Sequence, residues 1–182
     1  GRNGSGKTCM FRAIMGEVNA QNSFVKINDK VITGCDHMGL YIKYLPQKSF
    51  LPPKLTLSKV FYYFGKEYNS FAAEFPHFAK YENIQVRELS GGEIWLCLNS
   101  GAPFCILDEP FSYLAPIYVE QVQQIIKRHK EHMGIIISDH NYRAILQITD
   151  EVLLLTDGYV HLVKEMSDLV RYGYCKDLSA IE

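Results

Sequence analysis

Apolar and polar positions follow one another along the chain in a pattern that predicts a mixed α/β fold. The apolar runs at 104–107 and 135–137 are short, continuous and separated by a predicted helix, which is typical of buried parallel strands. Two short strands within 23–34 are expected around a turn at Asn28–Asp29, and further strands over 40–46, 103–110, 134–138, 151–157 and 159–163. Helices are expected directly after a polar loop at 1–8, and over 58–81, 117–132, 142–148 and 167–172.

The segment 58–81 differs from the rest of the chain because its pattern is helical and rich in aromatic residues. Most of these aromatic side chains are expected to fill the core of a small helical part. We therefore predict one domain over 1–182, in which a helical subdomain over roughly 48–100 is inserted into an α/β core.

Charge and cysteine content narrow the possible functions. Nineteen Lys and Arg nearly balance twenty Asp and Glu, so the net charge of -1 argues against broad electrostatic capture of nucleic acid. The five cysteines show no metal-ligand spacing, and reduced thiols in a cytosolic protein are the expected state. No apolar stretch approaches the ~18 residues of a membrane span, so separate subunits would have to cross any membrane involved.

The first eight residues, GRNGSGKT, match the pattern G-x-x-x-x-G-K-[ST] known as Walker A. Glycines in this pattern let backbone amides turn toward phosphate oxygens, and the following helix adds its N-terminal amides. Lys7 is expected at the β- and γ-phosphates and the Thr8 hydroxyl at Mg²⁺. The alternative is an ordinary glycine-rich turn before a helix. The predicted ATP-binding residues of the loop are Gly1, Asn3, Gly4, Ser5, Gly6, Lys7 and Thr8.

Two carboxylates, Asp108 and Glu109, follow the apolar run at 104–107. A buried strand that ends in this way delivers its acids to the edge of the sheet where ligands bind. Asp108 is expected to hold Mg²⁺, and Glu109 to polarise the attacking water as the base. An acidic pair after a strand is often only a solvated loop, and the upstream Walker A pattern is what favours the catalytic interpretation.

The segment 89–93 reads LSGGE, and with it the chain resembles the ATP-binding cassettes of ABC transporters, whose signature is LSGG followed by Gln or Glu. By itself the segment could be a helix N-cap with flexible glycines. The resemblance implies that Ser90, Gly91 and Gly92 bind the γ-phosphate of ATP held by a second copy. It also implies a P-loop NTPase fold with a RecA-like core of the ABC ATPase type.

The same resemblance assigns two isolated polar residues. Gln47, in LPQKSF, is similar to the Q-loop glutamine, which binds the Mg²⁺ or the water and senses γ-phosphate. His140, in IIISDH, is similar to the switch histidine beside the catalytic water. A lone histidine or glutamine carries little information. These roles are supported by the order along the chain, which is Walker A, Gln47, LSGGE, the Asp108–Glu109 pair and His140, as in the family. The segments DEPFSYLAPIYV and SDHNYRAI resemble cassettes of lipopolysaccharide export and branched-chain amino acid uptake.

Three departures from the family pattern stand out. Two strands and an adenine-stacking aromatic residue, which the family places before Walker A, are expected to lie outside this sequence, which leaves its own nucleotide affinity open. The segment after LSGGE is short, which predicts a shortened signature helix. Ala115 stands where the D-loop of the family carries aspartate, which predicts weaker coupling between paired sites.

The resemblance implies an ATP-hydrolysing subunit of an ABC transporter that pairs with a second cassette, most simply an identical one, around two MgATP. Its expected partners are transmembrane permease subunits rather than nucleic acid. Its expected location is cytoplasmic, at the inner face of the cell membrane. The alternatives are an ABC ATPase without a membrane partner and a regulatory cassette that binds ATP without hydrolysing it.

Overall fold

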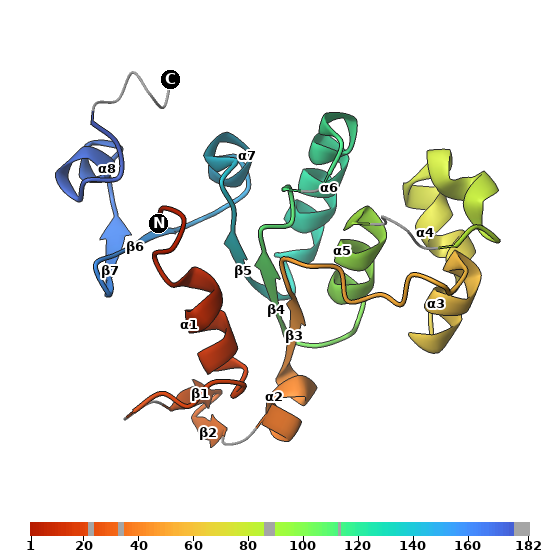
Figure 1. Ribbon diagram of the computed structural model, residues 1–182, viewed down its shortest axis with the longest axis horizontal. Helices are drawn as coiled ribbons and strands as arrows, with labels where there is room; N and C mark the ends of the chain where they lie inside the picture. The colour runs from red at the N-terminus through yellow and green to blue at the C-terminus, as the bar shows by residue number, and fades with distance from the viewer. Residues whose placement is uncertain (22–23, 33–34, 86–89, 113, 177–182) are drawn as a thin grey trace.

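The computed structural model describes residues 1–21, 24–32, 35–85, 90–112 and 114–176, and of residues 35, 36 and 90 it describes the backbone alone. Its centre is a parallel sheet in the order β3 (Ile42–Leu45), β4 (Phe104–Asp108) and β5 (Gly134–Ser138). Figure 1 shows these three strands side by side, with α1 (Lys7–Ile14) on one face and α5 (Ser90–Leu98) and α6 (Pro116–His129) on the other. The predicted parallel pairing is confirmed, but the run 135–137 is not fully buried as expected, because Ile136 is 47% exposed.

The side chains of β4 point alternately to the two faces of the sheet and so pack against the helices on both faces. Cys105 and Leu107 lie in a core cluster with α5 and α6, whereas Ile106 packs with Phe11 of α1 and Ile42 of β3. Successive strand side chains point to opposite faces, so a strand buried on both faces must be apolar throughout. By the same alternation Asp108 shares the α1 face with Ile106, which directs its carboxylate toward the phosphate loop.

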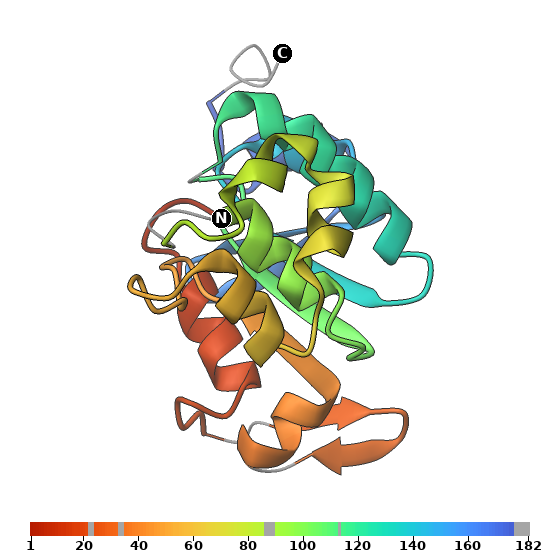
Figure 2. The same cartoon turned by 90° about the vertical axis from the view of Figure 1, so that its right-hand side faces the viewer.

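The helical part lies between β3 and β4 along the chain. It contains α3 (Leu57–Tyr63), α4 (Tyr68–Glu74), a 3₁₀ helix (Pro76–Tyr81) and α5. In Figure 2, α5 lies in front of the sheet and next to α3 and α4. Phe61, Phe71 and Phe75 are at most 1% exposed and belong to one cluster with Trp95 of α5, so most of the aromatic run is core, as predicted.

Two antiparallel hairpins flank this core. β1 (Val25–Ile27) pairs with β2 (Lys30–Ile32), and β6 (Val152–Thr156) pairs with β7 (Tyr159–Val163). The predicted Asn28–Asp29 turn has positive φ at both residues, 46° and 66°, which is the two-residue turn that matches the twist of paired strands. The remaining helices are α7 (Tyr142–Leu146) and α8 (Ser167–Arg171).

One predicted strand is partly wrong. Residues 40–41 were expected to begin a strand over 40–46, but they close a helix, α2 (Cys35–Tyr41), and the strand covers only Ile42–Leu45. Met38 of this helix is 2% exposed in the cluster with Phe11, so tertiary packing supports a helix that Gly39 disfavours. The predicted helix over 117–132 also differs at its ends: α6 begins at Pro116, a favourable first residue of a helix, and ends at His129 rather than 132.

Among the helices that the structure describes, none combines the length and the apolar character needed to cross a membrane.

Candidate functional site

The loop that precedes α1 has the backbone conformation that its glycines permit. Gly4 and Gly6 have φ of 76° and 97°, values that other residues rarely adopt. The Lys7 Nζ donates to the carbonyl oxygens of Gly1 and Arg2, each 3.1 Å away. These two carbonyls hold the ammonium group at the loop, where an anionic ligand could replace them as its partner.

Two other loop residues differ in their surroundings. Asn3 is exposed, whereas the Oγ of Ser5 is buried and is the one buried side-chain polar atom without a hydrogen-bond partner in the described part of the chain. A buried hydroxyl without a partner is destabilising, and a phosphate oxygen would satisfy it. The loop therefore has the donors of an anion site with one of them unpaired.

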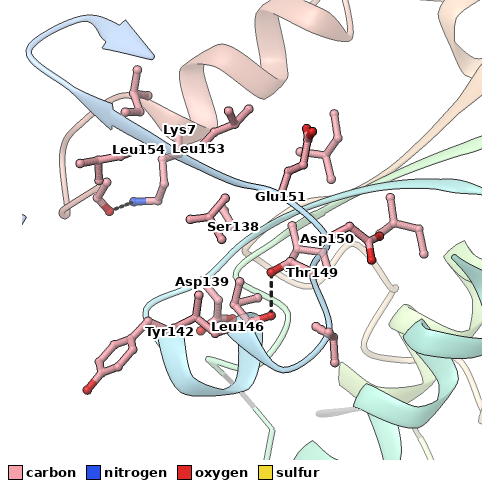
Figure 3. Close-up of a pocket in the computed structure, with 18 of the residues that line it drawn as sticks. Lys7, Ser138, Asp139, Tyr142, Leu146, Thr149, Asp150, Glu151, Leu153 and Leu154 are labelled. Atoms are coloured by element: carbon pink, nitrogen blue, oxygen red, sulfur yellow. Dashed lines mark hydrogen bonds between the residues drawn. The ribbon is translucent and has the colours of Figure 1, made fainter. Parts of the chain in front are cut away.

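A groove of about 620 Å³ adjoins this loop, between β5, β6 and α1. Figure 3 shows Lys7 and Ser138 at the groove together with Leu153 and Leu154 of β6. Among the described strands β5 pairs only with β4, and β6 pairs only with β7, so an edge of each borders the groove. The groove brings the phosphate loop, the end of β5 and the β6–β7 hairpin to one place.

Asp108, at the end of β4, accepts hydrogen bonds from three hydroxyl groups. Its Oδ2 accepts from the Thr8 Oγ1 at 2.7 Å and from the Tyr44 hydroxyl at 3.3 Å, and its Oδ1 accepts from the Ser138 Oγ at 2.5 Å. Burial first, and then the neighbouring carboxylate, raise the pKa of the Tyr44 hydroxyl, which therefore stays protonated and remains a donor. Asp108 is 1% exposed, so these bonds offset the cost of burying its carboxylate.

The Thr8–Asp108 pair fits a small divalent cation. Mg²⁺ prefers oxygen ligands and typically takes one or two carboxylates together with phosphate oxygens and water. The residues that the structure describes contain no group of three or more His, Cys, Asp or Glu side chains that would enclose a metal without a phosphate ligand. Thr8 and Asp108 could thus hold the cation of a metal–nucleotide complex.

Glu109 is the centre of a second cluster. Its Oε1 lies 2.7 Å from the His140 Nε2, and its Oε2 accepts from the Gln47 Nε2 at 2.6 Å and from the Ser112 Oγ at 3.2 Å. Its φ of 55° is in the left-handed region, which is uncommon for a residue with a long side chain. Gln47 and Glu109 are 62 positions apart along the chain, so only the fold brings them together.

Asp139 ties the loop after β5 to the loop after β4. Its Oδ2 accepts from the Phe111 amide and its Oδ1 from the Asn141 amide, both at 2.8 Å. Burial raises the pKa of its carboxyl, and the two backbone hydrogen bonds partly oppose that rise. These bonds fix the positions of His140 and Glu109 relative to each other, because each lies within two positions of a residue that Asp139 bonds.

The N-terminus of α5 lies elsewhere. Gly91 has as nearest neighbours Phe75 and Leu114, at 3.6 and 3.8 Å from where its Cβ would stand, rather than residues of the phosphate loop. Leu89 and the Ser90 side chain lie outside what the structure describes, and Gly91 and Gly92 are buried. Of the signature residues, Gly91 thus has its nearest neighbours in the helical part and in the segment after β4.

Gln47 bonds Glu109 in the structure, and its expected role at the metal or the water stays a prediction. Four contributors were missed in the sequence: Tyr44, Ser112, Ser138 and Asp139. Ser138 and Asp139 could have been found, because they directly precede His140 at the end of an apolar run, while Tyr44 gave no signal apart from its place in a strand.

Comparisons with known proteins show the family to which the chain belongs. The family model described as ABC transporter matches residues 1–112. The chain is 27% identical to the ABC transporter ATP-binding protein YhaQ of Bacillus subtilis, over 87% of this chain and 58% of that protein. It is 26% identical to the lipopolysaccharide export system ATP-binding protein LptB of Escherichia coli K12, over 88% of this chain and 75% of that protein.

A solved structure described as the ATP binding subunit of an ABC transporter has the same fold, with a TM-score of 0.72, 19% identity, and coverage of 99% of this chain and 84% of that one. The predicted resemblance to lipopolysaccharide-export ATPases is confirmed at the level of sequence, and the resemblance to branched-chain amino acid uptake stays a prediction. The family match covers more than half of the chain. It includes Asp108, Glu109 and those of their hydrogen-bond partners that precede them in the sequence. The chain therefore belongs to the ABC transporter family and has the P-loop NTPase fold of its ATP-binding proteins.

Proposed function

We propose that the protein hydrolyses MgATP between two paired copies and thereby drives transport by separate membrane subunits. The observation that carries the proposal is the meeting of Gln47, Glu109 and His140 next to the Thr8–Asp108 contact. Hydrolysis needs a base, groups that orient a water, and a cation site within a few ångströms of one another. These five side chains supply all three.

In this proposal the phosphate loop binds the nucleotide. Lys7 exchanges its two carbonyl partners for β- and γ-phosphate oxygens, and the loop amides and the Ser5 hydroxyl donate to the same groups. Thr8, Asp108 and Gln47 would hold Mg²⁺, which would supply neutralisation of the phosphate charge. Gly1, Asn3, Gly4 and Gly6 complete the loop that surrounds the phosphates.

Glu109 acts as the base in this proposal. Its carboxylate accepts a proton from the water that attacks the γ-phosphate, and His140 and Gln47 orient that water. Both oxygens of Glu109 are now engaged by His140, Gln47 and Ser112, so at least one of these partners has to release it before it faces a water. Phosphate binding supplies the reason for release, because it offers His140 and Gln47 alternative acceptors.

Pairing follows from the position of the α5 N-terminus. Ser90, Gly91 and Gly92 begin a helix of nine residues, whose amides favour an anion, yet the nearest neighbours of Gly91 are Phe75 and Leu114 rather than residues of the phosphate loop. We propose that a second copy, arranged head to tail, places its own γ-phosphate there. Each nucleotide then holds the pair together, and its hydrolysis releases it.

The first test is the dependence of turnover on protein concentration. If two copies form each site, phosphate release per molecule from MgATP should rise with protein concentration and level off as the dimer forms, which ultracentrifugation would follow on the same samples. The same protein with EDTA in place of Mg²⁺ is the control. An ATP-dependent dimer without phosphate release would instead favour the regulatory cassette.

Membrane subunits are the proposed partners because an aromatic patch lies next to the Gln47 segment. We define this patch by Phe50, Tyr62, Tyr63 and Phe64, whose exposed fractions range from 38% to 77%. Phe50 and Phe64 are in edge contact, with ring centroids 5.9 Å apart. Contiguous exposed aromatics mark protein interaction sites, and the helical part, residues 48–100, would pass motion from the nucleotide to such a partner.

A Tyr62→Ser, Tyr63→Ser variant should therefore keep its MgATP turnover and lose its association with membranes that contain the permease subunits. Both side chains are more than two thirds exposed, so the fold should not change. The measurement is sedimentation of the purified protein with such membranes, with Tyr159→Ser, at an equally exposed aromatic residue on β7, as control. Undiminished sedimentation of the variant would exclude the patch as the docking surface. Failure of the unmodified protein to sediment with these membranes would leave an ABC ATPase without a membrane partner as the better alternative. The expected location, at the inner face of the cell membrane, rests on this partnership.

A further inference from the structure

Glu93 is a buried carboxylate in the first turn of α5, and one of its oxygens makes three contacts. The Oε1 accepts from the Ser49 Oγ at 2.6 Å, from the Phe50 amide at 3.0 Å and from the Leu51 amide at 3.3 Å. The residue is 5% exposed. Three consecutive residues of one segment thus surround a single oxygen of another element, as successive amides do in an anion-binding turn.

This contact has to be strong for the carboxylate to remain buried. A carboxylate in the interior is costly unless it is fully hydrogen-bonded or paired with a cation. Among the described ion pairs none includes Glu93, so the three donors and the N-terminal end of α5 are its stabilisation. The segment 49–51 and α5 should therefore move together rather than separate.

Both ends of this link are parts of the proposed site. Ser49 follows Gln47 by two positions, and Gln47 bonds Glu109. On the other side, Glu93 directly follows the Ser90–Gly92 turn that begins α5. Leu51 adds an apolar contact, because it is 5% exposed in the same core cluster as Trp95 of α5. Among the described residues, the hydrogen bonds of Glu93 are the only side-chain hydrogen bonds that join these two segments.

We propose that Glu93 is a positioning residue that couples the Gln47 segment to the N-terminus of α5. This inference rests on the proposed function, because it assigns a mechanism of regulation to the same site. When Gln47 exchanges Glu109 for the nucleotide, the displacement of 47–51 passes through Glu93 and turns the Ser90–Gly92 amides toward the phosphate of the partner copy. Binding in one copy thereby prepares that copy to receive the other.

The test compares Glu93→Ala with Glu93→Gln. Alanine removes the acceptor and leaves three donors unsatisfied, whereas the amide oxygen of glutamine can accept the same bonds. In a Glu109→Gln background, Glu93→Ala should weaken MgATP-driven dimerisation by at least about tenfold. Glu93→Gln should stay within about threefold, and the affinity of the monomer for MgATP should be unchanged in both. Ser49→Ala, which removes one donor of three, should lie between them.

Trp95 gives a second readout that stability alone would not change. It is the single tryptophan of the chain, lies on α5 and is 4% exposed. Its fluorescence should change when MgATP binds to the monomer, and this response should disappear in Glu93→Ala while the cooperative thermal transition remains. If Glu93→Ala does not fold, Ser49→Ala replaces it in the same measurement, and its change in Trp95 fluorescence on MgATP binding should be smaller than that of the unmodified protein.

Two failures are distinguishable. A protein that neither hydrolyses MgATP nor dimerises with it would overturn the proposed function, whatever Glu93 does. A protein that does both, and in which Glu93→Ala and Ser49→Ala dimerise and respond as the unmodified chain does, would overturn the coupling alone. Glu93 would then be a structural link that holds a loop onto a helix.

Discussion

Glu109→Gln should lower the rate of MgATP hydrolysis by two to four orders of magnitude, the usual contribution of a positioned general base. The amide keeps the shape of the side chain and can still accept from Gln47, so the fold and nucleotide binding should be preserved. It cannot accept a proton from the attacking water. The variant should consequently accumulate as an MgATP-bound dimer, visible by ultracentrifugation beside a phosphate-release assay.

A control variant with the same change of charge separates the loss of the base from a general effect of removing one negative charge. Glu17→Gln removes a carboxylate from a surface ion pair with Arg12, whose side chains are 45% and 49% exposed, and should leave turnover unchanged. Turnover of Glu109→Gln close to that of the unmodified protein would remove Glu109 from the role of base.

Asp108→Asn should have an effect of similar size through a different property, the affinity for Mg²⁺. The amide lacks the charge that attracts the cation, and it offers one acceptor oxygen where Thr8, Tyr44 and Ser138 now use two. Loss of cation binding should lower turnover by about two to three orders of magnitude. The Mg²⁺ concentration for half-maximal activity should rise as well, which a titration at fixed ATP would measure.

The control for this variant is Asp29→Asn, in the β1–β2 turn. Its side chain is 93% exposed, and asparagine tolerates the positive φ of that position. Circular dichroism would verify that Asp108→Asn folds, since a buried amide with an unmatched hydrogen is itself destabilising. An unchanged Mg²⁺ titration with reduced turnover would assign Asp108 to a purely structural role.

Much of the fold is predictable because its signals are local. The apolar runs at 104–107 and 135–137 are too short and too continuous for exposed helices, and the structure shows them as paired parallel strands. The Asn28–Asp29 turn was equally clear, since few residues adopt two positive φ values. Helix α2 was missed because its seven residues contain Gly39 and its stability comes from Met38 packing against α1.

The residues of the candidate site also fall into two groups, those that a local motif predicts and those that only the tertiary fold brings to the site. Residues within one motif, such as Lys7 and Thr8, could be assigned from spacing. The partners of Asp108 and Glu109 could not, because Tyr44 and Ser112 matter only through contacts that the tertiary fold creates. Glu93 shows the limit most plainly. In the sequence, Glu93 only occupies the last position of the signature, where the family has either Gln or Glu. The structure alone shows that its Oε1 accepts hydrogen bonds from the segment after Gln47.

The left-handed backbone of Glu109 has a consequence for anyone who engineers this protein. A residue with a long side chain at φ 55° costs on the order of 1 kcal/mol or more, which glycine would largely recover. A search for thermostable variants that scores melting temperature alone would thus be drawn toward the position that the proposed chemistry needs most. Selection schemes for this protein should include turnover from the first round, because stability and activity favour different residues at the end of β4.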